Sequence, residues 1–230
     1  MIVIGIASPK GGAGKTTIAI ALASVYCQKY KVCLLDADPK QRAYEWADNT
    51  EKLEDAVMPE NLKVLGHPGK ADEVLSRIAE ERGKDTEIMI IDVEGSENMT
   101  MAYSIAASNV VVIPSKDSFQ DAEDVISTVK IIQSQEQIAN RKIKHLVVFN
   151  EVDAHIVTKD IKEIASDLDS LKIPYAKTRL VRRRAHRAPH YYGGILHDLP
   201  TKDVSGVDAA IRDAQELADE ILMEFSDGKA

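Results

Sequence analysis

Long apolar runs, basic leader segments and abundant cysteine are all missing from this chain of 230 residues. It contains no uninterrupted apolar stretch of about 18 residues, so we expect no helix that spans a bilayer. It opens on a strand-like run, residues 2–7, and not on a basic segment followed by a long apolar one, which argues against a secretory signal. These absences predict a cytoplasmic protein without membrane contact.

Cysteine is limited to Cys27, in a helical pattern, and Cys33, in a strand pattern. Their spacing fits neither a structural zinc site nor an iron–sulfur cluster. We therefore interpret both as free buried thiols in a reducing compartment, and we disfavour a metallocluster reductase or carrier.

Acidic residues are absent from residues 170–197, although the whole chain carries 37 of them and a formal net charge of −8. Basic residues are common in the same segment: Lys172, Lys177, Arg179, Arg182, Arg183, Arg184 and Arg187. Such asymmetry indicates a local anion-binding surface on an acidic body.

We predict that the five arginines of this segment contact the DNA backbone without sequence preference. If the segment is helical, Arg183 and Arg187 lie on one face of the helix. Tyr191 and Tyr192, which follow, could stack on bases, but packing against the sheet is favoured. A solvated or nucleotide-adjacent stretch is the alternative interpretation of the whole segment.

Apolar runs typical of buried strands alternate with helical patterns along most of the chain. The expected strands are residues 2–8, 31–35, 62–65, 87–91, 110–113 and 143–149, with a short one near 173–176. The expected helices are residues 16–29, 71–82, 122–137, 158–171 and about 206–226. This alternation predicts right-handed crossovers and a doubly wound, mostly parallel sheet flanked by helices. With 44% hydrophobic residues and no long linker, residues 1–230 are expected to form a single α/β domain.

The last helical pattern carries an apolar stripe that could face either a membrane or the protein core. Its polar side is almost entirely acidic, with Arg212 opposed by Asp208, Asp213, Glu216, Asp219, Glu220 and Glu224. Anionic lipids would repel such a face, so we expect this helix to pack on the core.

The strongest signal is the glycine-rich run from Pro9 to Thr17, which follows the first strand and opens the first helix. Phosphate binding needs backbone N–H groups that point inward, and glycine lets the chain curl that tightly. The helix N-terminus near Gly14 adds a partial positive charge. In such a P-loop, Lys15 reaches the β- and γ-phosphates and the Thr16 hydroxyl completes the Mg²⁺ shell. The predicted nucleotide contacts are Lys10, Gly11, Gly12, Ala13, Gly14, Lys15, Thr16 and Thr17, which indicates ATP and Mg²⁺ as ligands.

Carboxylates follow two of the expected strands. Asp36 and Asp38 come after the second strand, on the same side by alternation, and Asp92 comes after the strand at 87–91. Because open α/β sheets bind ligands at the carboxyl ends of their strands, we predict that Asp36, Asp92 and Thr16 serve the metal. Asn150 follows the strand at 143–149 and is predicted to contact the adenine, with a cap or turn role as the alternative.

The loop departs from the common pattern G-x-x-x-x-G-K-[ST], because Pro9 replaces the first glycine and Lys10 adds a second lysine. In this departure the chain resembles the ParA/MinD group of deviant Walker A ATPases. Matching motifs are Lys10–Thr17, Asp36–Pro39 with Gln41, Trp46, and Ile113-Pro114 with Ser118 and Asp121. The resemblance covers nearly the whole chain, most strongly residues 1–121. It is closest to small plasmid-partition ParA proteins and to the ParA-like proteins of conjugative DNA transfer.

The resemblance implies a P-loop NTPase that hydrolyses ATP slowly and cycles between a monomer and a sandwich dimer. Lys10 would cross to the partner's phosphates, Asp38 would orient the hydrolytic water, and Asp92 would support the metal from its outer shell. The ATP-bound homodimer would bind non-specific DNA on the nucleoid. A ParB-like or other adaptor protein would stimulate hydrolysis and release it. No helix-turn-helix precedes the first strand, so we expect no operator-specific repression.

Two departures from the family pattern are Lys40 and Glu94. Glu94 adds negative charge near the γ-phosphate, so we expect slower or differently triggered hydrolysis. The alternatives are a MinD-like spatial regulator, a cargo-positioning ATPase that does not act on plasmid DNA, and a metabolic P-loop synthetase. The acidic last helix disfavours a membrane-bound regulator, and no polar cluster indicates the substrate pocket of a synthetase.

Overall fold

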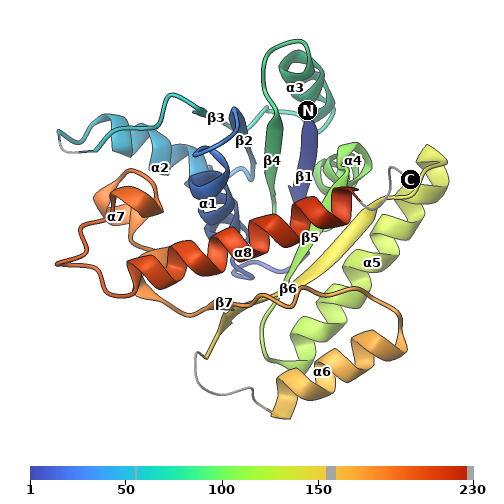
Figure 1. Cartoon of the computed structure of the whole chain (residues 1–230). Helices are drawn as coiled ribbons and strands as arrows, with labels where there is room; N and C mark the ends of the chain where they lie inside the picture. The colour runs from blue at the N-terminus through green and yellow to red at the C-terminus, as the bar shows by residue number, and fades with distance from the viewer. Residues whose placement is uncertain (55, 154–158, 227–230) are drawn as a thin grey trace.

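The computed structural model describes residues 1–54, 56–153 and 159–226, which form a central sheet with helices on both faces (Figure 1). The strands are β1 (Ile2–Ile6), β2 (Val32–Ala37), β3 (Leu62–Leu65), β4 (Ile88–Val93), β5 (Val110–Ser115), β6 (Lys144–Val152) and β7 (Leu180–Val181). The longer helices are α1 (Lys15–Tyr26), α2 (Arg42–Glu51), α3 (Glu73–Arg82), α4 (Met99–Ala107), α5 (Phe119–Ala139), α6 (Lys159–Ser170) and α8 (Val207–Ser226). The short ones are η1 (Arg184–His186), α7 (Pro189–Tyr192) and η2 (Leu196–Asp198).

Every strand pairing among the described residues is parallel, and the strand order is β3-β2-β4-β1-β5-β6-β7. The chain therefore winds outward from β1 in both directions, which confirms the predicted doubly wound P-loop fold. All the strands point the same way, so their carboxyl ends meet at one edge of the sheet. This edge carries the loop that follows β1.

Alternating residues of the strands divide the core into two layers. Ile4 and Ile6 face one layer with α1, α2 and α8, whereas Val3 faces the other with α3, α4, α5 and α6. The helix α8 lies across the first face in Figure 1. The Tyr26 hydroxyl of α1 donates a hydrogen bond to the backbone carbonyl of Ala218 in α8 at 2.9 Å. The last helix thus contributes its apolar side to this layer of the core.

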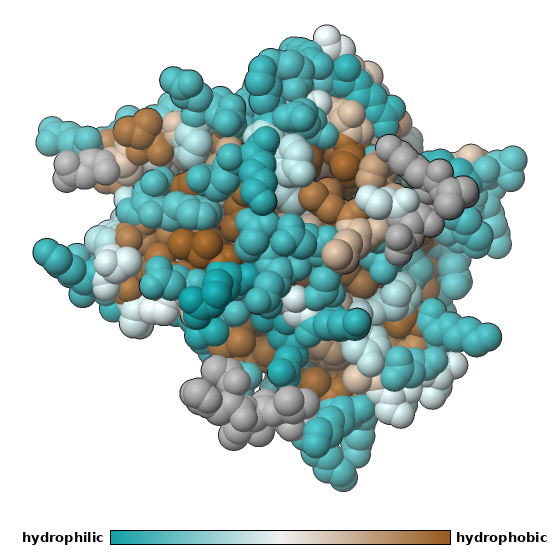
Figure 2. Space-filling model, in the orientation of Figure 1, coloured by the Kyte–Doolittle hydropathy of each residue, from teal (hydrophilic) through white to brown (hydrophobic). Residues whose placement is uncertain are grey.

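Hydrophilic residues cover most of the face drawn in Figure 2, and hydrophobic residues show between them in smaller patches. None of the described helices has the length and apolar character needed to cross a bilayer. Both cysteines are buried and free, as predicted.

The predicted strands match β1 to β6 within a few residues, but the strand expected near 173–176 was wrong. Only Tyr175 forms an isolated bridge there, to Val147, and the last strand is β7, within the arginine segment. Two of the longer helices, α2 and α4, were not predicted, and neither was the short α7. The signals of the two longer ones are present: α2 buries Ala43, Trp46 and Ala47 at helical spacing, and the Asn98 side chain caps α4. The first residue of the helix predicted at 158–171 lies outside the described residues, and α6 follows it.

Candidate phosphate-binding site

The loop between β1 and α1 owes its course to two glycines in the left-handed region. Gly12 has φ 80° and Gly14 has φ 92°, and Gly14 is the N-cap residue of α1. A Cβ atom on Gly14 would lie 2.0 Å from Nδ2 of Asn150, whereas one on Gly12 would meet nothing within 4 Å. Gly14 is therefore required both by backbone conformation and by close packing against β6. The helix begins at Lys15, one residue before the predicted start at residue 16.

Lys15 closes this loop on itself. Its side chain is buried, and Nζ donates to the carbonyl oxygens of Ser8 at 3.0 Å and Lys10 at 2.9 Å. Burial lowers the pKa of Lys15, and the negative charge of Asp92 opposes that shift. A buried ammonium held only by carbonyls is poised to gain a stronger, anionic partner.

Asp92 is the least satisfied polar group at this edge. It lies on β4 in register with Asp36 of β2 on one side and Ile6 of β1 on the other. It is 1% exposed, and neither carboxylate oxygen forms a hydrogen bond with a described residue. Burial raises its pKa to about 7, with the Thr16 hydroxyl and the Lys15 charge opposing the shift. An orphaned carboxylate beside Thr16 fits a nearby cation, directly or through water.

Asp36 is equally buried but fully engaged. One oxygen accepts from the backbone N–H of Asp38 at 3.0 Å, and the other accepts from those of Ala43 at 2.8 Å and Tyr44 at 3.1 Å. Asp36 thus holds the turn after β2 and the start of α2. Asp38 is half-exposed, and its side chain accepts from the backbone N–H of Lys40 at 2.9 Å. The predicted roles of Asp36 at the metal and of Asp38 at water stay predictions.

Lys10 leaves the loop and reaches toward α5. Its Nζ pairs with Asp121 at 2.8 Å, while Asp124 lies at 3.9 Å. The hydrogen bond to Asp121 raises the pKa of Lys10. Its side chain is still 33% exposed, so the two loop lysines face different surroundings: Lys15 points inward and Lys10 points outward.

Asn150 braces the loop from β6. Its side chain is 2% exposed, and Nδ2 donates to the carbonyl of Ala13 at 3.0 Å. This contact keeps Gly14 and the helix start in place. The predicted contact of Asn150 with adenine stays a prediction, because its amide is already engaged with the loop.

Gly95 is a site residue that the sequence analysis missed. It lies in the loop after β4, where a Cβ atom would come within 2.9 Å of Lys15 Nζ and 3.0 Å of the Gly11 nitrogen. Its neighbour Glu94 accepts a hydrogen bond from Asn98, the cap of α4, and its charge opposes the lowering of the Lys15 pKa that burial causes. The loop from β4 to α4 therefore rests on the phosphate loop. A glycine three residues after Asp92 was the available signal.

The arginine segment does not form one helix. It runs through β7, where the backbone N–H of Arg182 donates to Val152 of β6 at 2.8 Å, into η1 and α7. The condition under which Arg183 and Arg187 would share a helical face is therefore not met, because strand pairing holds the first part of the segment extended.

Two of the arginines are also compensated. Arg183 pairs with Asp213 of α8 at 3.1 Å, and Arg187 pairs with Glu151 at 2.6 Å. These acids lie far away in sequence, which a count within residues 170–197 could not reveal. By contrast, Arg179, Arg182 and Arg184 form no ion pair with any described residue.

The two tyrosines after η1 lie in different surroundings. Tyr191 is 82% exposed, so the expectation that it packs against the sheet was wrong. Tyr192 is partly buried against the α1 layer of the core.

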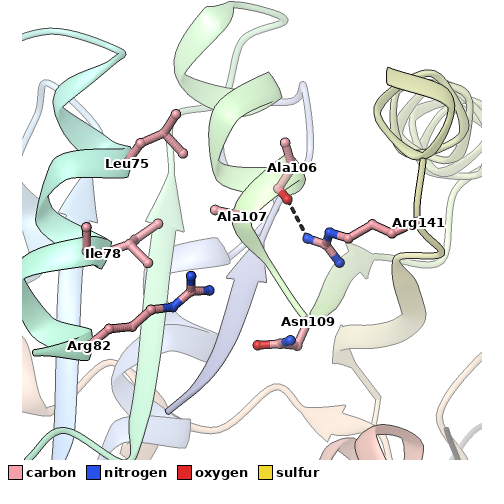
Figure 3. Close-up of a pocket in the computed structure, with 8 residues that line it drawn as sticks. Leu75, Ile78, Arg82, Ala106, Ala107, Asn109 and Arg141 are labelled. Carbon is pink, nitrogen blue, oxygen red and sulfur yellow. Dashed lines mark hydrogen bonds between the residues drawn. The ribbon is translucent and has the colours of Figure 1, made fainter. Parts of the chain in front are cut away.

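A cavity of about 420 Å³ lies at the opposite edge of the sheet. Figure 3 shows Ile78 and Arg82 of α3 on one side and Arg141 on the other, its guanidinium bonded to the Ala106 carbonyl. Asn109, which also lines it, accepts from the backbone N–H of Val3 at 2.8 Å, near the start of β1. The cavity is therefore remote from the phosphate loop and takes no part in the predicted site.

Curated relatives match the chain over most of its length. It is 29% identical over 228 residues to Protein ParA of Rhizobium radiobacter, covering 99% of both chains. It is 25% identical over 206 residues to the Maintenance of carboxysome distribution protein A of Halothiobacillus neapolitanus, covering 89% of this chain and 91% of that protein.

A solved structure with the same fold is the cobyrinic acid a,c-diamide synthase of Mycobacterium smegmatis with bound ATP analogue and magnesium. Its TM-score is 0.71 at 18% identity, covering 100% of this chain and 97% of that one. Residues 4–189 match the family CbiA, described as the CobQ/CobB/MinD/ParA nucleotide binding domain. The phosphate loop, the parallel sheet and this match agree, and the chain belongs to the CobQ/CobB/MinD/ParA nucleotide binding domain family.

Proposed function

We propose that this chain is an ATP-hydrolysing positioning motor, which dimerises with ATP, binds DNA without sequence preference and is released when a partner protein stimulates hydrolysis. The observation that carries the proposal is the phosphate loop with its two differently placed lysines. Lys15 is buried against loop carbonyls, and Lys10 leaves the loop for the surface. Because Lys10 points away from the loop that Lys15 closes, we assign it a contact beyond its own subunit.

Nucleotide binding is inferred from two buried charged groups, Lys15 and Asp92, which lack a partner of opposite charge in hydrogen-bond contact among the described residues. The β- and γ-phosphates of ATP would replace the carbonyls at Lys15 and accept from the backbone N–H groups of Gly11 to Thr17. Thr16 and Asp92 would hold Mg²⁺, Asp92 through water, with Asp36 beside them in register. The ion supplies positive charge to the transferring phosphoryl group. The ATP analogue and magnesium in the diamide synthase structure support this choice of ligands.

Dimerisation is assigned to Lys10. The Lys10 side chain is 33% exposed and is tethered by an ion pair to Asp121, which is only 6% exposed, and a phosphate would be a stronger partner for Lys10. In the ATP-bound dimer Lys10 would leave Asp121 and contact the γ-phosphate of the other subunit. Asp38, half-exposed at the turn after β2, would orient the attacking water.

DNA is assigned to the arginines of residues 179–187, of which Arg179, Arg182 and Arg184 form no ion pair with a described residue. Two copies of the segment on one dimer would raise the avidity for DNA, so ATP would control binding through dimerisation. The names of the two curated relatives support a positioning role. The load could be a plasmid or a protein body, and an adaptor protein would select it.

The test combines phosphate release with retention on a non-specific duplex, measured across salt with ATP, with ADP and without nucleotide. We expect slow ATP turnover and DNA binding only with ATP. The slope of log binding constant against log salt concentration should be about −0.9 for each phosphate contacted. The variant Lys10→Ala should keep ATP binding and lose both the dimer and the DNA. Turnover without DNA binding in any state would contradict the DNA assignment, and no turnover at all would contradict the motor.

A further inference from the structure

A cavity of about 550 Å³ opens on the arginine segment, and we call it the arginine–tyrosine cavity. Basic and aromatic side chains make up its wall almost completely: Arg182, Arg183, Arg184, Arg187, Ala188, Tyr191 and Tyr192. Its size falls in the range of small-molecule sites. None of the described residues that line it is acidic, although the protein as a whole is acidic.

The charge at this cavity is only partly compensated. Arg183 is paired with Asp213, and Glu151 is shared between Arg187 and Lys116, at 2.6 Å and 2.7 Å. One carboxylate therefore serves two cations. Arg182 and Arg184 are exposed and have no ion-pair partner in the described part of the chain. Several guanidinium groups around one hollow attract an anion with several oxygens, such as a phosphodiester.

Tyr191 gives the cavity an aromatic wall, and the segment that carries it is firmly anchored. The Gly194 carbonyl accepts from the Trp46 indole at 2.9 Å, and the Gly194 nitrogen donates to the Thr50 hydroxyl at 3.1 Å. Gly193 has φ 68°, and a Cβ atom there would lie 2.7 Å from Leu53. The backbone beside Tyr191 is thus fixed against α2, while the ring is 82% exposed. A fixed backbone with an exposed ring lowers the entropy cost of stacking a flat ligand on it.

We propose that the arginine–tyrosine cavity binds one unpaired nucleotide of a DNA strand, with the base stacked on Tyr191 and its phosphate held by Arg182 and Arg184. A duplex offers its phosphates on a convex surface and keeps its base faces covered by neighbouring pairs. A concave pocket with an aromatic wall can therefore use its tyrosine only on an unstacked base. This inference rests on the DNA binding of the proposed function and adds a preference for single-stranded segments.

The experiment compares fluorescein-labelled dT12 with a 12-base-pair duplex by anisotropy, using the full chain with ATP. We expect Tyr191→Ala to weaken binding of dT12 by about tenfold and to change duplex binding less than twofold. Tyr191→Phe should keep both affinities, because the ring remains. Arg182→Gln should weaken the binding of both dT12 and the duplex, since both carry phosphates. Ile138→Ala, at an apolar residue of α5 that is also largely exposed, is the matched control and should change neither affinity.

Each other outcome overturns the proposal in a recognisable way. Equal loss on both DNAs, or no loss on dT12, removes the stacking role of Tyr191 while ATP-dependent duplex binding leaves the proposed function standing. A loss of ATP affinity in Tyr191→Ala would assign the cavity to the base of ATP instead. If the wild-type chain binds neither DNA in any nucleotide state, the DNA part of the proposed function fails and the inference fails with it.

Discussion

The phosphate-loop edge and the arginine segment are built on opposite principles. At the first, Asp36 and Asp92 are buried to within 1% and fixed by strand register, so negative charge lies in a dry environment. At the second, Arg182 and Arg184 are exposed on an irregular stretch, so positive charge lies in water. In the first region, backbone strain and buried charges without sufficient partners are confined to a few atoms. The second spreads weak attraction over a surface. We therefore expect single substitutions to have large effects in the first region and small ones in the second.

The largest effect should come from Asp92→Asn. ATP turnover should fall by about 100-fold or more, because the carboxylate that would support the metal loses its charge. The same change should stabilise the nucleotide-free protein by about 1–2 kcal/mol at pH 8, since an amide avoids the cost of a buried anion. Phosphate release and urea unfolding measure the two effects. Asp85→Asn, at an exposed pair with Lys31, should change neither. A less stable, fully active Asp92→Asn would contradict this account of the site.

The next effect separates backbone strain from crowding within the loop. Gly14→Ala should lower the free energy of unfolding by about 2–3 kcal/mol, because it combines a positive φ with a clash on Asn150. Gly12→Ala has the positive φ without the clash, and about 1 kcal/mol is expected. Adding Asn150→Ala should recover part of the loss in Gly14→Ala and none in Gly12→Ala. Equal costs at the two glycines would show that packing against β6 does not matter.

The position of the phosphate loop between β1 and α1 could be predicted because its sequence signals are local. Glycines and lysines at fixed spacing between a strand and a helix determine where N–H groups and charges lie. Asp36 and Asp92 end apolar strands, so the parallel sheet brings them together. What could not be predicted was the partner of each group. Asp36 caps α2, and Lys10 pairs with Asp121. Both contacts depend on how the loops after β1 and β2 fold, which the sequence pattern does not indicate.

The arginine segment was harder to predict because its meaning depends on residues far away in the chain. Seven cations without a nearby acid read as one uncompensated patch. The structure divides them, because α8 supplies Asp213 and β6 supplies Glu151. The short strand β7 forms only through pairing with β6, and two residues carry too little pattern to indicate it. Periodicity alone therefore could not decide between helix and strand here.

The third prediction tests this division of the arginines. Charge reversal of Arg182 and Arg184 together should weaken duplex binding by at least about tenfold and reduce the salt slope by about 1.8, with the stability unchanged. Arg183→Gln should do the reverse. It should cost about 1 kcal/mol of stability through the loss of Asp213 and change DNA affinity little. Anisotropy across salt and thermal unfolding give the two readouts. If Arg183→Gln weakened DNA binding more than the change at Arg182 and Arg184, all the arginines of the segment would have to be treated as equivalent DNA contacts.

The smallest effect concerns pH, where the two regions should differ in sign. His186 is 6% exposed, and burial lowers its pKa to about 4 from 6.5. The unfolded chain therefore binds more protons between these values, and the stability from neutral His186 is lost as pH falls through this window. Asp92, with its pKa raised to about 7, makes the opposite contribution, because the folded state holds the extra proton. Replacing His186 by Phe should remove on the order of 1 kcal/mol of the stability change between pH 7 and pH 5. Urea unfolding midpoints at pH 7 and pH 5 measure this change in stability. An unaltered pH dependence in His186→Phe would mean that this histidine is charged inside the fold.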